Sequence, residues 1–301
     1  MTAFRNGGLG VTFGKLFLIL KCRTQKRPVK FEEIEKSLIM CYDISFTVNM
    51  RQLSDYFPDL IFDSQINLDF ELGTHIIGHS YGDHPIIYKN KEDGKLYCKL
   101  MEWGCIPFYV KDEKAFLRQR ASMLNARSER ILDDAKSYWY KIRNRRCLVP
   151  VTGIYEHREI KGWKKKVPYY VQLNSQPMFF IPGLYSVVEL PDTTTGEIIK
   201  RTTFTIITRN ANSVMRNIHN GGDNKGRMPL FLPFEFSKKW LDDDLSDEAY
   251  KHILDFEMPS EELKYHPVFT IRSAKARPDE KAKTEHYEWE KLPVLGVLNP
   301  D

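Results

Sequence analysis

The sequence lacks the patterns that define several classes of protein. Its longest apolar run near the start, at 16–20, is far short of the about 20 residues that a membrane-spanning helix needs, and no small-residue cleavage site follows it. Its cysteines form no CxxC motif and no Cys/His pair at zinc-ligand spacing. We therefore expect no membrane association, no disulfide framework, no metal, no cofactor, and a reducing, cytoplasmic location.

The body of the chain also lacks a net charge. Lys plus Arg number 45 and Asp plus Glu number 40, a formal excess of +5 over 301 residues. Residues 1–40 carry eight basic and three acidic side chains, so 41–301 carries 37 of each sign. Overall charge is therefore no argument for nucleic-acid binding. A local cluster at 118–166, with fourteen basic residues against five acidic ones, is either a phosphate-binding surface or an ordinary solvated face.

Residues 1–40 show no sustained helical or strand period. We interpret them as an N-terminal extension that is either the product of a misplaced start codon or removed from the mature chain. Residues 41–301 are expected to form one domain, because no linker or internal repeat divides them.

Apolar and β-branched runs bounded by turn residues predict strands at 76–77, 86–88, 147–155, 169–173, 178–188, 202–208, 268–271 and 294–298. Helical patterns are fewer and lie at 50–57, 113–124, 130–142, 211–218, 234–241 and 247–256. The strands cluster without regular helical crossovers, which favours an α+β fold with mostly antiparallel sheet.

Four short segments place reactive or orienting groups beside turns and strand ends, where active sites tend to lie. They are Met40-Cys41, the run Asn125-Ala126-Arg127-Ser128-Glu129, the run Gly153-Ile154-Tyr155-Glu156, and His219 followed by Arg227-Met228-Pro229. Taken singly, each has an ordinary structural interpretation, since a lone cysteine is more often a buried small hydrophobe than a nucleophile.

Taken together and in this order, the segments resemble the SOS-response-associated peptidase family, the abasic-site processing proteins. The resemblance covers residues 40 to about 241. It is supported by the run Arg145-Arg146-Cys147-Leu148-Val149-Pro150 before Gly153, and by Ile206-Ile207-Thr208 continued by Ala211-Asn212. The resemblance implies a barrel-like, mostly antiparallel β-sheet with peripheral helices, and a single-stranded DNA partner that contains abasic sites.

The family's chemistry implies that Cys41 becomes the mature N-terminus and joins covalently to the abasic site. A ring-opened abasic sugar is an aldehyde. An N-terminal cysteine can condense with it through its α-amine and then close a five-membered thiazolidine through its thiol, whereas an internal cysteine has only an amide nitrogen. An α-amino pKa near 7.7 to 8.0 leaves a neutral fraction at cellular pH. The protein would thus be an enzyme with lyase-like crosslinking and autopeptidase activity, nucleoid-associated when bound to DNA.

The resemblance also assigns roles to other residues. Glu156 would shuttle protons near the amine and help to expose Cys41, and His219 would assist sugar ring opening. Asn125 would hold the sugar by hydrogen bonds. The expected DNA contacts are a set of cationic and aromatic side chains, with Phe108 and Tyr109 stacking on bases: Arg127, Trp103, Phe108, Tyr109, Arg145, Arg146 and Arg227.

The sequence departs from the family pattern at three places. Asp43 stands where an arginine is common, and its charge would repel a DNA backbone unless a cation offsets it. Asp83-His84-Pro85 replaces a turn that ends in Ala-Pro, and an insertion at 220–226 could move Arg227 away from the site.

Two other functions remain open. One is a cysteine hydrolase in which Cys41 attacks a carbonyl, His219 acts as the base and Asn125 orients it. The other is a non-catalytic nucleic-acid-binding module that uses the basic stretch at 118–166.

Overall fold

The computed structural model describes residues 43–69, 72–192, 194–272 and 276–296. The chain divides into two units, 1–37 and 38–301, and the described residues all belong to the second. The predicted extension at 1–40 and Cys41 lie outside the described residues, so what the sequence predicts for them stays a prediction.

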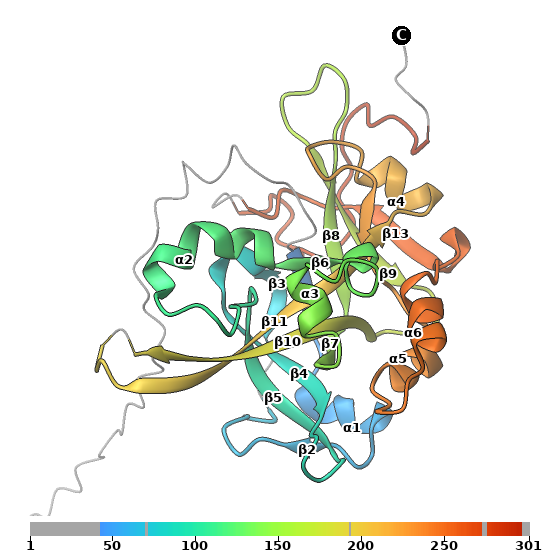
Figure 1. Cartoon of the computed structure of the whole chain (residues 1–301). Helices are drawn as coiled ribbons and strands as arrows, with labels where there is room; N and C mark the ends of the chain where they lie inside the picture. The colour runs from blue at the N-terminus through green and yellow to red at the C-terminus, as the bar shows by residue number, and fades with distance from the viewer. Residues whose placement is uncertain (1–42, 70–71, 193, 273–275, 297–301) are drawn as a thin grey trace, which may run out of the picture. The chain divides into compact units, whose positions relative to one another are not determined.

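The described chain is an α+β protein in which strands outnumber helices (Figure 1). The strands are β1 Asp43–Phe46, β2 Ile61–Phe62, β3 Gly73–Ile77, β4 Asp83–Lys89, β5 Leu96–Trp103, β6 Asn125–Arg127, β7 Arg146–Val151, β8 Gly153–Arg158, β9 Val167–Leu173, β10 Phe179–Pro191, β11 Ile198–Asn210, β12 Arg227–Pro229 and β13 Leu263–Pro267. The α-helices are α1 Leu53–Tyr56, α2 Glu113–Arg120, α3 Tyr138–Lys141, α4 Ser213–Ile218, α5 Phe234–Trp240 and α6 Asp247–Leu254. Single 3-10 turns lie at Met50–Gln52, Gly78–Ser80, Ala121–Met123, Ser128–Arg130 and Ser260–Glu262.

Five strands close into a barrel. β11 pairs with β10, β10 with β7, β7 with β4 and β4 with β5, all antiparallel. β5 then pairs with β11 in parallel and completes the ring. A second, wholly antiparallel sheet has the order β13-β9-β8-β1-β3. The predicted α+β class with mostly antiparallel, barrel-like sheet is confirmed.

Strand β7 is buried on both faces, which explains its apolar sequence after Arg146. Successive side chains of a strand point to opposite faces. Val149 therefore joins a core cluster with Ile154 of the second sheet, while Leu148 joins another cluster with Trp240 and Tyr250 from α5 and α6. The two faces of β7 thus contribute to different core clusters, one shared with the second sheet and one shared with α5 and α6.

Some predicted elements are wrong. The expected helix at 130–142 is reduced to α3, because the Asp134 carboxylate accepts from Lys136 N in a tight turn and Ser137 caps a new helix start. The expected strand at 147–155 is split between β7 and β8 at Thr152, whose N–H donates to Ser45 O of β1. The segment 268–271 is not a strand, and β13 precedes it. At 294–298 the described part, to residue 296, is not a strand, and the rest lies outside the described residues.

Candidate active site

The Gly-Ile-Tyr-Glu segment begins β8 and buries its glutamate. A Cβ on Gly153 would lie 2.3 Å from the Tyr170 ring, so only glycine lets that ring pack against the strand. The Tyr170 hydroxyl is 2.7 Å from Ser45 Oγ, which ties β9 to β1. Three residues beyond Gly153, the Glu156 side chain is 2% exposed.

His219 lies beside this carboxylate. Its Nδ1 is 2.8 Å from the carbonyl oxygen of Arg227 and 3.9 Å from Glu156 Oε2, and the ring is fully buried. A carbonyl only accepts hydrogen bonds, so Nδ1 carries a proton and Nε2 bears the lone pair of the neutral ring. Nε2 has no hydrogen-bond partner among the described residues. The imidazole is therefore oriented to take up a proton at Nε2 and to return it.

The insertion at 220–226 closes on itself rather than moving Arg227 away. Gly226 N donates to His219 O at 2.8 Å, so the two ends of the loop meet. Gly226 has φ +72°, a left-handed conformation that glycine adopts without strain. Ala211 N donates to Gly226 O at 2.8 Å, which ties the loop end to the segment after β11. Arg227 thus stays next to His219.

Asn125 carries a buried amide on β6. The residue lies on β6, opposite Ile206 of β11, and is 5% exposed. Neither Nδ2 nor Oδ1 has a hydrogen-bond partner within the described ranges. Buried amides are nearly always satisfied in native proteins, so this one is suited to bind a ligand that supplies both a donor and an acceptor.

The two motif arginines have different environments. Arg127 is exposed, and its Nη2 donates to Asn224 Oδ1 at 2.9 Å, which links β6 to the insertion. Arg227 is 8% exposed and forms a two-pronged ion pair with Glu129. Burial opposes ionisation of Glu129, but its hydrogen bond to Arg227 lowers its pKa. The structure leaves Arg127 accessible to a phosphate and engages Arg227 in structural contacts.

Asp43 is compensated rather than repulsive. Its side chain is 2% exposed, with Oδ1 2.8 Å from His75 Nε2 and Oδ2 2.5 Å from Arg272 Nη2. Burial alone would raise the Asp43 pKa, but the His75 hydrogen bond and the Arg272 charge lower it to about 2. No local sequence signal points to Arg272, which is 229 positions away.

The replaced turn at 83–85 is part of strand β4, and its histidine belongs to the core. His84 is fully buried, and burial lowers its pKa to about 4. Its Nε2 donates to Pro150 O at 2.8 Å, and its ring packs edge-on against Phe46. This imidazole is neutral and structural.

The aromatic residues divide into a buried and an exposed group. Trp103 is 1% exposed, stacks on Phe204 and donates from Nε1 to Leu124 O at 3.0 Å. The prediction that Trp103 contacts DNA does not fit this position, because neither ring face is open. Phe108 and Tyr109 are 45% and 56% exposed and remain candidates for base stacking.

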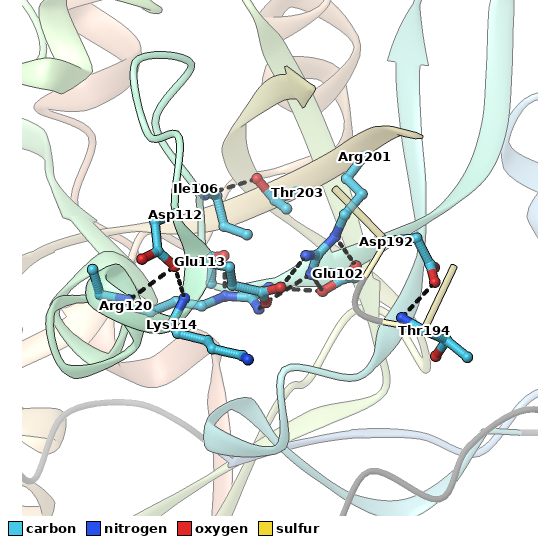
Figure 2. A network of polar contacts seen from close by, with 12 residues as sticks. Glu102, Ile106, Asp112, Glu113, Lys114, Arg120, Asp192, Thr194, Arg201 and Thr203 are labelled. Atoms are coloured by element: carbon cyan, nitrogen blue, oxygen red, sulfur yellow. Dashed lines mark hydrogen bonds and ion pairs between the residues drawn. The ribbon is translucent and has the colours of Figure 1, made fainter. Parts of the chain in front are cut away.

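A network of two arginines and two glutamates anchors the loop that carries the exposed aromatic residues (Figure 2). Arg201 of β11 binds Glu102 of β5 and Glu113 at the start of α2, and Arg120 binds the same two carboxylates. Arg120 also donates from Nε to Gly104 O at 3.0 Å. The network therefore joins the barrel, α2 and the first turn of the loop.

Two further backbone contacts hold the same loop. Ile106 N donates to Thr203 Oγ1 at 2.9 Å, a contact drawn in Figure 2. Phe108 N donates to Tyr138 Oη at 3.3 Å, and that hydroxyl lies 2.7 Å from Ser186 Oγ. These contacts hold the loop backbone while leaving the Phe108 ring partly exposed.

Arg145 and Arg146 also differ. Arg146 is 9% exposed, and its guanidinium donates to the carbonyl oxygens of Trp240 and Asp242. These contacts leave it structural rather than available to DNA. Arg145 is partly exposed, and its Nη1 has no hydrogen-bond partner in the described part of the chain.

The described cysteines are poor nucleophiles. Cys98, Cys105 and Cys147 are buried. Burial raises the pKa of Cys98 and of Cys105 to about 12, and that of Cys147 well above its usual value. Their thiolates are therefore scarce at neutral pH.

Within the described ranges, no group of three or more His, Cys, Asp or Glu side chains could hold a metal ion. No helix in the part of the chain that the structure describes has the length and apolar character to cross a membrane.

The fold and the site define a β-barrel protein of the α+β class with a buried Glu/His pair and a buried unsatisfied amide. The family model for the SOS response associated peptidase (SRAP) matches residues 40–271. The chain belongs to this family. The match includes Cys41, Asn125, Glu156 and His219.

The comparisons identify relatives named for DNA processing. The chain is 33% identical over 150 residues to "Abasic site processing protein YoqW" of Bacillus subtilis, which covers 50% of this chain and 59% of that protein. It is 30% identical over 171 residues to YobE of the same organism, and this match covers 57% of this chain and 70% of that protein. It is 26% identical over 201 residues to HMCES of Xenopus tropicalis, and this match covers 61% of this chain and 56% of that protein. Both proteins carry the same "Abasic site processing protein" name. The match to YoqW thus spans under two thirds of that relative's length.

Solved structures share the fold. A protein from Bacteroides thetaiotaomicron has a TM-score of 0.64 and 27% identity, and the alignment covers 81% of this chain and 97% of that one. A protein from Bordetella bronchiseptica, 20% identical with a TM-score of 0.55, shares the fold alone.

Proposed function

We propose that this protein crosslinks to abasic sites in single-stranded DNA through Cys41, after residues 1–40 have been removed. Family membership and the names of the relatives support the class of activity. The observation that carries the proposal is the buried pair of Glu156 and His219, with Nε2 of His219 unpartnered among the described residues. Such a pair suits proton transfer to and from a small reacting group.

The chain geometry supports Cys41 as the nucleophile. Asp43 begins β1 and pairs with Tyr155, the residue before Glu156. Cys41 is two positions before Asp43 in the sequence, and the described chain begins on the strand next to the one that carries Glu156. The three described cysteines are buried with raised pKa values, which leaves them unsuited to the task.

The reaction balances without a cofactor. The neutral α-amine of Cys41 adds to the aldehyde carbon of the ring-opened sugar, and loss of water gives a Schiff base. The thiol then adds to the same carbon, and its proton is transferred to the nitrogen, which closes the thiazolidine. Glu156 takes the proton from the amine and returns it to the departing hydroxyl, and His219 transfers a proton at Nε2 to open the sugar ring.

The remaining residues bind and orient the substrate. The unsatisfied amide of Asn125 holds the sugar oxygen, and Arg127 pairs with a neighbouring phosphate. Phe108 and Tyr109, both exposed, stack on unpaired bases of the same strand.

A peptide cleavage before Cys41 is the second activity that we propose. The amine is an amide while residues 1–40 are attached, so the crosslink requires their removal or a later start. The oriented His219 and the buried Glu156 can transfer protons in this peptide cleavage as they do in crosslink formation. Intact-mass measurement of protein from its native source tests this, and a mature chain that keeps Met1 would overturn the thiazolidine chemistry.

The crosslink is tested with protein that begins at Cys41 and single-stranded DNA that holds one abasic site. We expect an adduct that resists denaturation and disappears in Cys41→Ala. An unchanged adduct in that variant contradicts the proposal. Turnover of a small peptide without an adduct would favour the hydrolase. DNA binding that is insensitive to changes at Cys41, Glu156 and His219, with no covalent product, would favour the binding module.

A further inference from the structure

A cationic hollow lies beside the exposed Phe108 ring, outside the Glu156 and His219 site. The hollow has a volume of about 370 Å³ and is lined by Phe108, Lys111, Arg145, Val187, Val188, Glu189 and Lys200. Three of these side chains are cationic and one is acidic. The residues come from three parts of the chain: the aromatic loop, the segment before β7, and the hairpin of β10 and β11, which extends from the barrel in Figure 1.

One cation in the hollow has an unused donor. The Nη1 atom of Arg145 is buried and has no hydrogen-bond partner among the described residues. Lys111 and Lys200 are exposed, so they can turn toward a ligand without a change of fold. An anion in the hollow would gain charge-assisted contacts with these two lysines and lie beside the partly exposed Arg145.

We propose that this hollow binds a phosphate of single-stranded DNA whose neighbouring base stacks on Phe108. An aromatic face next to a cluster of cations is the combination that binds single strands without regard to sequence. The inference rests on the proposed function in taking DNA as the ligand and in placing the reacting nucleotide at Asn125.

The position of the hollow indicates which part of the strand it binds. Lys200 and Ile206 lie on β11, and Ile206 is opposite Asn125. Six residues of strand span about 20 Å. The hollow therefore holds nucleotides several positions from the one that reacts, and only oligonucleotides long enough to reach it gain from it.

Another hollow provides a matched control. It is lined by Lys89 and Lys239 together with Asp242, Asp243 and Asp244, so its acidic residues outnumber its lysines. A phosphate is repelled there. Lys239 is exposed, as Lys111 and Lys200 are.

The experiment measures non-covalent binding of labelled, undamaged single-stranded DNA of increasing length, over a range of salt concentrations. For long oligonucleotides, we expect the double variant Lys111→Ala/Lys200→Ala to bind about tenfold more weakly at low salt. The slope of log K against log salt should fall in magnitude by about 0.7, since one lost phosphate contact removes about 0.7 on a single strand. Glu189→Gln should bind more tightly, and Lys239→Ala should bind as the parent does.

A parental salt slope in the double variant, with its thermal unfolding unchanged, would overturn the inference. Equal weakening for the shortest and the longest oligonucleotides would overturn it as well. The abasic-site adduct is measured separately: loss of the adduct with this binding intact rejects the crosslinking proposal alone. If the double variant forms the adduct normally and its salt slope is unchanged, the proposal for the hollow alone is rejected.

Discussion

Nδ1 of His219 donates to the main-chain carbonyl of Arg227 at 2.8 Å. The same contact selects the tautomer of the imidazole and fixes which nitrogen is available for chemistry. The intervening loop closes through Gly226 N and His219 O, so the insertion supports this geometry. Arg227 thus acts on the site through its backbone, while its side chain holds Glu129.

The tautomer makes His219→Asn informative. The asparagine amide can replace the Nδ1 donor to Arg227 O, but it has no atom in the place of Nε2. We expect this variant to fold and to form the adduct about a hundredfold more slowly, in the range of general acid–base catalysis. Single-turnover crosslinking measures the rate, and circular dichroism checks the fold. A parental rate would remove His219 from the mechanism.

Glu156→Gln removes the carboxylate and keeps its shape. We expect slower adduct formation, and slower removal of 1–40 when these residues are present, because the amide cannot take up a proton at neutral pH. Glu159→Gln is the control, since Glu159 is exposed and pairs with Lys166 at 3.2 Å. Gel assays of adduct and mass spectra of the chain give both rates. If Glu159→Gln slows them as much as Glu156→Gln does, the buried carboxylate has no special role.

Asp43 makes stability depend on pH. Its pKa is about 2 in the folded protein against an ordinary value of 3.8, so the carboxylate contributes stability above pH 3.8 that is lost as the pH falls through about 2. The shift corresponds to about 2 kcal/mol. We expect Asp43→Asn to be less stable by about this amount near neutral pH, with the gap closing between pH 3.8 and about 2.

Urea unfolding at a series of pH values measures this difference. Asp69→Asn is the control, because Asp69 is 69% exposed and its ion pair with Arg51 is screened by water. A gap between parent and Asp43→Asn that does not change with pH would show that packing, not charge, accounts for the loss.

The two motif arginines should separate binding from stability. Arg127→Ala should weaken DNA binding and reduce the salt slope by about 0.7, because its exposed guanidinium meets a phosphate. Arg227→Ala should keep the slope but lower the free energy of unfolding by about 2 kcal/mol, because its buried contacts to Thr208 and Glu129 are lost. Fluorescence anisotropy and urea unfolding report the two quantities. Interchanged results would assign the phosphate to Arg227.

The sequence by itself determined the class of fold and the order of the motifs. Alternating and continuous apolar runs predicted most of the long strands, because a strand buried on both faces, such as β7 after Arg146, is mostly apolar. The motif residues Asn125, Glu156 and His219 could be named because their neighbours in the chain form a family pattern. The prediction of a helix over 130–142 is wrong, because local side-chain caps at Asp134 and Ser137 compete with a weak helical period.

Only the tertiary structure decided which charges are available and which are neutralised. Arg127 and Arg227 are the same residue type in the sequence, yet Arg127 is exposed and Arg227 is buried and paired with Glu129. The partner of Asp43 is 229 residues away, and the hollow beside Phe108 is assembled from three separate segments. Burial and ion pairing depend on neighbours in space, and barrel closure brings these together across sequence distances that no local pattern records.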